Sequence, residues 1–158
     1  MKMAKTVVVA LMAAVLIAGC AAVGELMSGR IIEGMPKLRD PLPRTVKVYF
    51  ADPVNVSGYA LHARNRKQIQ DAFFSAFAAV GVSSSVQTNG CDFAFHVAVT
   101  DWEYGDAGFS GQGDRDSVSM AVVLMNLKNE RVVARHELYA RNLDLLIRRY
   151  VEKLFEKK

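Results

Sequence analysis

The sequence predicts an α+β domain. We expect a single mixed β-sheet, in which a strand–helix–strand crossover is followed by antiparallel strands, with two amphipathic helices on one face. Two stretches carry apolar residues at the spacing of an amphipathic helix. Five stretches are typical of strands, most of them by alternation of apolar and polar residues. Their order is strand, helix, short strand, three long strands, helix. A strand–helix–strand unit favours a parallel, right-handed crossover, and the shorter connections between the last three strands favour antiparallel pairing.

The first predicted strand covers residues 45–51, and a loop over 53–63 follows it. The first helix is predicted over 64–80, and Gly81 ends it. Its apolar stripe consists of Ile69, Ala72, Phe73, Ala76, Phe77 and Val80.

Four further strands are predicted over 83–88, 92–104, 117–127 and 131–141. The strand over 117–127 is apolar on both faces in its middle, which indicates a central position in the sheet. In the last strand, one face holds Val132, Ala134, His136, Leu138 and Ala140.

The closing helix is predicted over 143–155, with Asn142 or Asp144 as its N-terminal cap. The expected core lies between the sheet and both helices. It consists of Val48, Phe50, Phe73, Phe77, Phe95, Val97, Val122, Leu124, Leu138, Ile147, Val151 and Leu154.

The N-terminus predicts export and lipidation. Lys2 and Lys5 precede an apolar run over 7–17 that is too short to cross a bilayer as a helix. The run ends in the sequence L-I-A-G-C, which resembles the lipobox of bacterial lipoproteins. By this resemblance, residues 1–19 are a signal peptide and Cys20 carries a covalent diacylglycerol and an N-acyl chain such as palmitate. The alternative is an ordinary secretory leader that ends near a cysteine.

The predicted location is the periplasmic face of the outer membrane, with the lipid as the anchor. Stable anchoring needs more than one acyl chain, which this modification supplies. Ala21, in place of an aspartate, is similar to enterobacterial signals for the outer membrane. Residues 20–43 are expected to be a lipidated tether before a domain over 44–158, because they contain several glycines and prolines and show no sustained period. A weak helix over 25–35 is the alternative.

The charge argues against nucleic acid as a partner. The formal net charge is +4, and Lys2 and Lys5 leave with the leader, so the mature chain carries about +2. Nucleic-acid binding needs a dense basic stripe. Once Cys20 is lipidated, Cys91 is the one remaining cysteine, which excludes an intramolecular disulfide. Cys91 is expected to be a small buried side chain.

The most unusual segment is 101–115, with the sequence D-W-E-Y-G-D-A-G-F-S-G-Q-G-D-R. Its spacing of carboxylates and glycines matches no calcium loop. It leads into a strand, so it offers no helix N-terminus for a phosphate. A structural interpretation is a strand connector that Trp102 and Phe109 hold against the domain. Its carboxylates are Asp101, Glu103, Asp106 and Asp114.

The histidines His62, His96 and His136 are scattered and lack ligand spacing, so no metal site is expected, although His96 and His136 are candidates for neighbours across the sheet. Ser57, Ser110 and Ser117 lack the context of a nucleophile elbow. No cofactor and no enzyme activity are expected.

The chain is similar to a small proteobacterial lipoprotein family, domain of unknown function 4823, over roughly residues 44–158. The resemblance rests on the lipobox, the first strand, the Ala/Phe-rich helix around 71–77 and the run from Trp102 to Arg115. It also rests on the pairs Leu145-Leu146, Tyr150-Val151 and Leu154-Phe155 of the closing helix. The family implies no activity.

Three functional hypotheses remain. The first is a binding or envelope-assembly accessory module without catalysis, whose partner is an envelope protein, peptidoglycan or lipid. The second is a carboxylate-dependent envelope hydrolase that uses residues 101–115, and the third is a purely structural envelope lipoprotein. Trp and Arg are frequent anchors at interfaces, which favours the first. The predicted partner-binding residues are Trp102, Glu103, Phe109, Ser110, Asp114 and Arg115.

Overall fold

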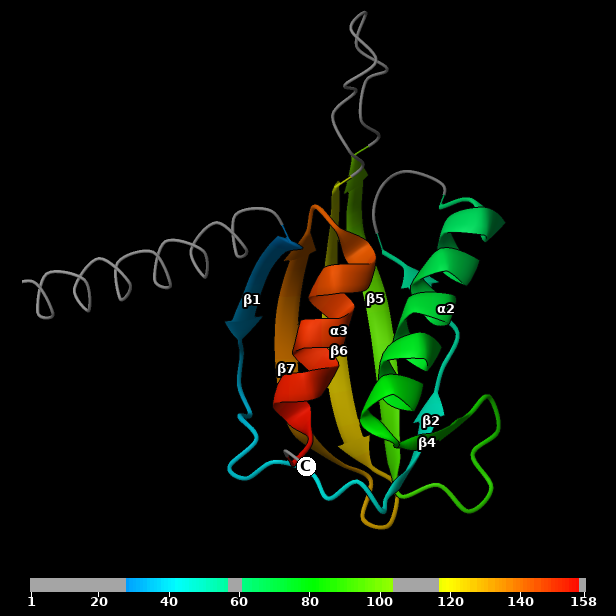
Figure 1. Cartoon of the computed structure of the whole chain (residues 1–158), viewed down its shortest axis with the longest axis vertical. Coiled ribbons are helices and arrows are strands. Elements are labelled where there is room, and N and C mark those ends of the chain that lie inside the picture. The colour runs from blue at the N-terminus through cyan, green and yellow to red at the C-terminus, as the bar shows by residue number, and fades with distance from the viewer. Residues whose placement is uncertain (1–27, 57–60, 104–116, 157–158) are drawn as a thin grey trace, which may run out of the picture.

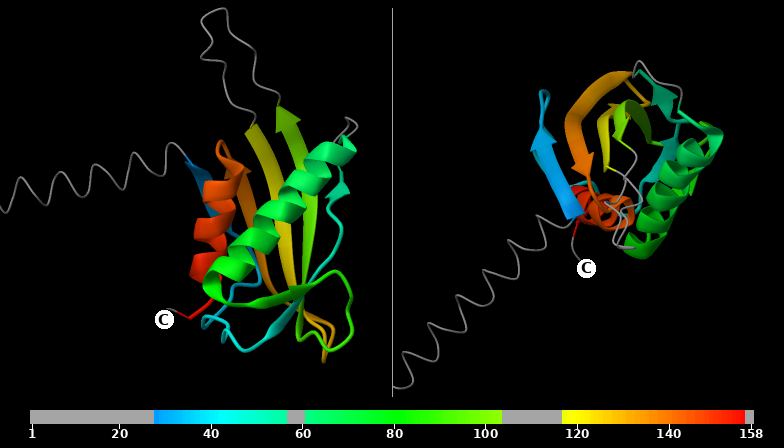
Figure 2. Two further views of the ribbon diagram at one scale, coloured as in Figure 1. Left: turned by 45° about the vertical axis from the view of Figure 1, so that its right-hand side comes forward. Right: turned by 90° about the horizontal axis from the view of Figure 1, so that it is seen from above.

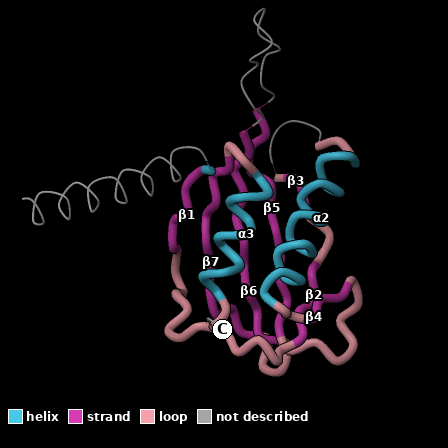
Figure 3. Tube along the Cα trace, in the orientation of Figure 1, coloured by secondary structure: helices cyan, strands magenta, loops and turns pink. Residues whose placement is uncertain are grey.

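One mixed sheet of seven strands, with two helices packed against one of its faces, makes up the described part of the chain (Figures 1 and 3). The structure is a computed structural model, and it describes residues 28–56, 61–103 and 117–156. The elements are β1 (Gly29–Glu33), β2 (Lys47–Phe50), β3 (Val54–Asn55), α2 (Ala63–Val80), β4 (Ser83–Ser85), β5 (Phe93–Glu103), β6 (Ser117–Asn126), β7 (Arg131–Ala140) and α3 (Leu143–Leu154). The predicted α+β class is confirmed.

The strand order is β1-β7-β6-β5-β2-β4, and β3 pairs with β5 just beyond the end of β2. β2 and β4, which α2 connects, are parallel, as the crossover rule predicts. β5, β6 and β7 are antiparallel neighbours, and β6 lies between the other two. The predicted central strand is therefore confirmed.

The core lies between the sheet and the two helices, which cross the same face side by side (Figure 2). Every residue of the predicted core is buried. Gly81 ends α2 in the left-handed conformation, with φ of 76°. The Asn142 side chain caps α3 by accepting a hydrogen bond from the Leu145 backbone N–H at 3.2 Å, so Asn142 is the cap of the two candidates.

The predicted face of Val132, near the start of β7, is wrong because the strand contains a β-bulge. Leu124 pairs with Ala134 and Met125 pairs with Val132, so Val133 is an extra residue. An extra residue reverses the alternation of side chains on one side of the bulge. Val132 is therefore exposed, whereas Ala134, His136, Leu138 and Ala140 are buried as predicted.

The predicted tether is wrong from residue 28 onward. Gly29–Glu33 forms an edge strand antiparallel to β7, in place of either a tether or a helix. Ser28 is fully buried. Its carbonyl accepts hydrogen bonds from the backbone N–H groups of Arg141 (3.2 Å) and Asn142 (3.3 Å). Its hydroxyl accepts one from Arg149 at 2.8 Å. Ser28, eight residues after Cys20 in the sequence, is therefore already part of the folded domain.

The chain that follows β1 is also part of the fold. Leu42 is buried in the core and pairs with Phe155 beyond the end of α3. The Arg44 guanidinium donates to the backbone carbonyls of Val80 and Glu156, each at 2.6 Å. Residues 28–44 therefore hold the sheet and the ends of both helices together, although their prolines and glycines are typical of a linker.

Candidate functional site

Two of the predicted partner-binding residues lie in the described part of the chain, Trp102 and Glu103, at the end of β5. Asp101, which precedes them, accepts a hydrogen bond from the Trp102 backbone N–H at 2.9 Å. The Ser117 hydroxyl donates to the Glu103 carboxylate, also at 2.9 Å. The other predicted residues, Cys20, Phe109, Ser110, Asp114 and Arg115, lie outside the described residues, as does Asp106.

A second β-bulge determines where Trp102 points. Val99 pairs with Met120 and Asp101 pairs with Ser119, so Thr100 is the extra residue. The bulge places Trp102 opposite the buried Val118, on the face that the helices cover. There the Trp102 side chain is half-buried and packs against the core. This position agrees with the structural interpretation of the segment, in which Trp102 holds it to the domain.

The two sheet histidines lie on opposite faces. His96 is exposed on the face away from the helices, where its ring meets Tyr49 edge-on. His136 is buried on the other face. Because the sheet separates their side chains, His96 and His136 cannot bind the same metal ion. Within the residues described, no group of three or more His, Cys, Asp or Glu side chains is placed to hold a metal ion.

His136 and Tyr150 form a buried polar pair between β7 and α3. The Tyr150 hydroxyl lies 2.9 Å from His136 Nδ1, and both residues are nearly inaccessible to solvent. Burial lowers the pKa of His136 below 6.5, and the nearby Glu33 carboxylate on β1 opposes this shift. Burial also raises the pKa of Tyr150. Both groups are therefore neutral at pH 7, which suits a hydrogen bond in the core.

The pair makes stability depend on pH. Because the pKa of His136 is lower in the folded protein than its unfolded value of about 6.5, the unfolded state takes up more protons in acid. The free energy of unfolding should therefore keep the contribution of His136 above about pH 6.5 and lose it below that value. His136→Gln should flatten this part of a urea-unfolding profile between pH 5 and 7. His96→Gln is the matched control and should leave it unchanged; equal slopes for both variants would contradict the assignment.

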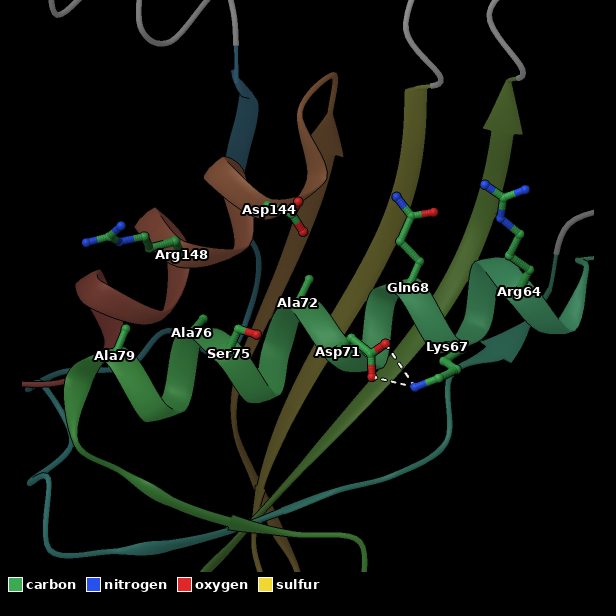
Figure 4. A pocket seen from close by; sticks show the side chains of 10 residues that line it. All are labelled: Arg64, Lys67, Gln68, Asp71, Ala72, Ser75, Ala76, Ala79, Asp144 and Arg148. Carbon is green, nitrogen blue, oxygen red and sulfur yellow. Dashed lines mark hydrogen bonds and ion pairs between the residues drawn. The ribbon is translucent and has the colours of Figure 1, made fainter.

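A groove of about 800 Å³ runs between α2 and α3 (Figure 4). Its floor is formed by small side chains of α2, such as Ala72 and Ala76. The Lys67 ammonium pairs with Asp71 at 2.9 Å, and Arg148 at the opposite rim pairs with Glu152 at 3.1 Å. Two of the three lining cations are therefore paired within their own helices, and the third, Arg64, lies at the start of α2.

A second surface of interest among the described residues is the sheet face away from the helices. The middle strand β6 presents partly buried small and aliphatic side chains there, among them Ser119, Ala121 and Val123. A hollow of about 260 Å³ lies on this face beside Ile32 and Tyr139. No described element covers this face of the sheet (Figure 2).

Exposed aliphatic side chains mark both edges of this open face. Ile32 on β1 is 47% exposed, and Val54 on β3 is 56% exposed. Neither strand is predicted from the sequence, because each is short and its residues are typical of a tether or a loop. The one local signal was the apolar pair Ile31-Ile32 within an otherwise polar stretch.

Cys91 is partly exposed, in contrast to the predicted burial. It lies in the connection before β5, where its thiol is 3.3 Å from the Gln87 carbonyl oxygen. Neither described helix is long and apolar enough to span a membrane.

The fold is shared with known proteins although the sequence is not. No protein-family model and no curated protein sequence matches the chain, so the resemblance to domain of unknown function 4823 is not confirmed. PelC from Paraburkholderia phytofirmans, a dodecamer in two crystal forms, superimposes with a TM-score of 0.61 at 18% and 16% identity, over 82% of this chain and 99% of PelC. Protein XCC0632 from Xanthomonas campestris, of the family DUF330, gives a TM-score of 0.50 at 13% identity, over 80% and 88%. These likenesses establish the fold.

Proposed function

We propose that this chain is an outer-membrane lipoprotein whose periplasmic domain is a binding and assembly module rather than an enzyme. The observation that carries the proposal is the uncovered sheet face, which ends in exposed aliphatic side chains at both edges. Contiguous exposed apolar surface on a folded domain commonly marks a contact with another macromolecule, and on this face the partly buried Ala121 and Val123 of β6 lie between the two edges. The primary partner in this proposal is a second copy of the chain.

The lipid on Cys20 would hold the domain close to the membrane. Ser28 belongs to the folded domain, and the eight residues from Cys20 to Ser28 span at most about 28 Å when fully extended. Ser28 lies beside the turn from β7 to α3. The ends of β5 and of β7 and the starts of α2 and α3 lie at this same end (Figure 1). We therefore orient this end of the domain toward the membrane.

The hydrogen bonds of two polar side chains that are typical of catalytic sites, Ser117 and His136, favour a structural role in this proposal. The Ser117 hydroxyl is bonded to Glu103, and His136 is bonded to Tyr150 inside the core. Nothing in the described residues favours the hydrolase hypothesis.

Self-assembly is suggested by the likeness to PelC, whose crystal structures are of a dodecamer. We extend to this chain the formation of an assembly of several copies, and we propose that this assembly is a ring or row on the membrane. Recruitment of a further envelope component through Trp102 and the residues that follow it is a second part of the proposal.

The experiment is mass spectrometry of the protein extracted in detergent from cell envelopes. The mature subunit should begin at Cys20 and carry the mass of a diacylglycerol and an acyl chain. It should sediment with outer membranes. Cys20→Ser is the control and should abolish the added mass and the membrane association. A mature subunit that begins elsewhere and is found in the soluble fraction would overturn the anchored location.

A further inference from the structure

Ile32 and Val54, the exposed aliphatic residues at the two edges of the sheet, lie at the same level along the strand direction, which we call the same height. Ile32 pairs with Glu137, Glu137 with Ala121, Ala121 with Ala98, and Ala98 with Val54. These five residues form one row across the sheet, from β1 at one edge to β3 at the other. Directly paired residues project from the same face, so Ile32 and Val54 both belong to the open face.

The strands at the two ends of this row run in opposite directions. β5 and β7 are each antiparallel to β6, so they run in the same direction. β1 is antiparallel to β7, whereas β3 is parallel to β5. Among the described strands, β1 pairs with β7 alone and β3 with β5 alone. When two copies stand upright side by side, β1 of one copy and β3 of the next are therefore antiparallel.

The proposed anchor excludes one symmetric arrangement, the antiparallel pairing of β1 with β1. In every copy Ser28 lies at the same end of the domain, eight residues from Cys20. Copies in one membrane must therefore stand with this end toward the lipid. An antiparallel pairing of β1 with β1 would turn one copy upside down, and eight residues are too few to reach around the domain.

We propose that copies of this chain assemble edge to edge, with Ile32 on β1 of one copy packed against Val54 on β3 of the next. This inference rests on the proposed self-assembly and names its contact. The two surfaces are unlike, so the contact is heterologous and builds a ring if the rotation between copies closes and a filament if it does not. Val56, 61% exposed, lies beyond Val54 on the same strand edge and extends the apolar contact.

The test is disulfide trapping in intact cells with the full-length, lipidated chain. The background variant is Cys91→Ser, which removes the partly exposed native thiol. Side chains paired across antiparallel strands lie close enough for a disulfide. The double variant Ile32→Cys/Val54→Cys should give a ladder of dimers, trimers and larger species after mild oxidation. Co-expressed single variants should give dimers that extend no further.

The matched control is Ile32→Cys/Val86→Cys. Val86 is 60% exposed, much like Val54, but it follows β4, which pairs with β2 beside Phe93 and Ala94 and so lies lower on the sheet. This control should give no ladder. A ladder of equal length in the control, dimers from either single variant expressed alone, or no ladder from the first double variant would each overturn the proposed contact. If the extracted protein is still an oligomer while the ladder is missing, the contact is wrong and self-assembly stands; a monomer refutes both.

Discussion

Replacing Phe77 by Ala should lower the free energy of unfolding by about 3–5 kcal/mol. Phe77 is fully buried on α2. Its ring centroid lies 5.0 Å from that of Phe95 on β5 and 6.3 Å from that of Phe155 beyond α3. Rings of Phe50 and Phe73 complete the cluster. Deleting this ring removes contacts to the sheet, to its own helix and to the C-terminal segment at once, and leaves a cavity.

The loss is measured by equilibrium unfolding in urea. Phe74→Ala is the matched control on the same helix, because Phe74 is half-buried and its ring lies 5.8 Å from Phe50. It should cost clearly less. If the two variants were equally stable, Phe77 would not lie at the centre of the core.

Replacing Gly29 by Ala should detach β1 from the sheet. Gly29 has φ of 118°, and a Cβ atom there would lie 1.9 Å from the Tyr139 carbonyl oxygen. That oxygen belongs to the backbone of β7, so it cannot rotate away as a side chain would. The chain must move, and the pairing of Ile31 and Ile32 with β7 is lost. We expect the free energy of unfolding to fall by more than about 2 kcal/mol. Strain of the backbone conformation alone costs about 1–3 kcal/mol, and the lost pairing of β1 adds to it.

Hydrogen exchange of the β1 amides, together with urea unfolding, measures this loss. Gly90→Ala is the control, because Gly90 also has a positive φ of 72° but a Cβ atom there would meet nothing within 4 Å. It should cost only about 1–2 kcal/mol and should leave β1 protected from exchange. Unchanged protection of β1 in Gly29→Ala would contradict the close approach of Gly29 to β7, whereas unprotected β1 amides in the wild-type protein would show that residues 29–33 are a tether.

The long elements could be predicted from sequence because their own residues decide them. β6 and β7 have ten residues each and α2 has eighteen, so a period is visible over several repeats. The buried residues of these elements could be predicted from the spacing of their apolar side chains. Asn142 was one of two cap candidates, and the distance from its side chain to the Leu145 amide distinguishes it from Asp144.

The short edge strands could not be predicted because their partners decide them. β1 has five residues and β3 has two, and each becomes a strand only by pairing with β7 or β5. The same is true of the bulges at Thr100 and Val133, which reverse the faces of Trp102 and Val132. The proposed contact residues Ile32 and Val54 lie on these two short strands. Sequence patterns therefore indicate the segment that begins at Trp102 and not Ile32 or Val54.

Because β1 is part of the sheet, the segment between the proposed anchor and the domain is shorter than the sequence predicts. A tether of some twenty residues would let the domain take any orientation toward the membrane. With the proposed lipid on Cys20, the short distance in sequence to Ser28, which is bound to the turn between β7 and α3, would restrict this orientation. The proposed assembly depends on this restriction, because unlike edges meet at equal height only when all copies stand in the same direction.

The mass of the intact assembly extracted from the envelope tests the proposed function most directly. Native mass spectrometry of the lipidated wild-type protein in a mild detergent reports the subunit mass and the number of subunits together. We predict a subunit that begins at Cys20 with its lipid, present as an oligomer of more than two copies. A lipidated subunit that remains monomeric at the concentrations found in the envelope would contradict self-assembly, and an unlipidated monomer would contradict the whole account.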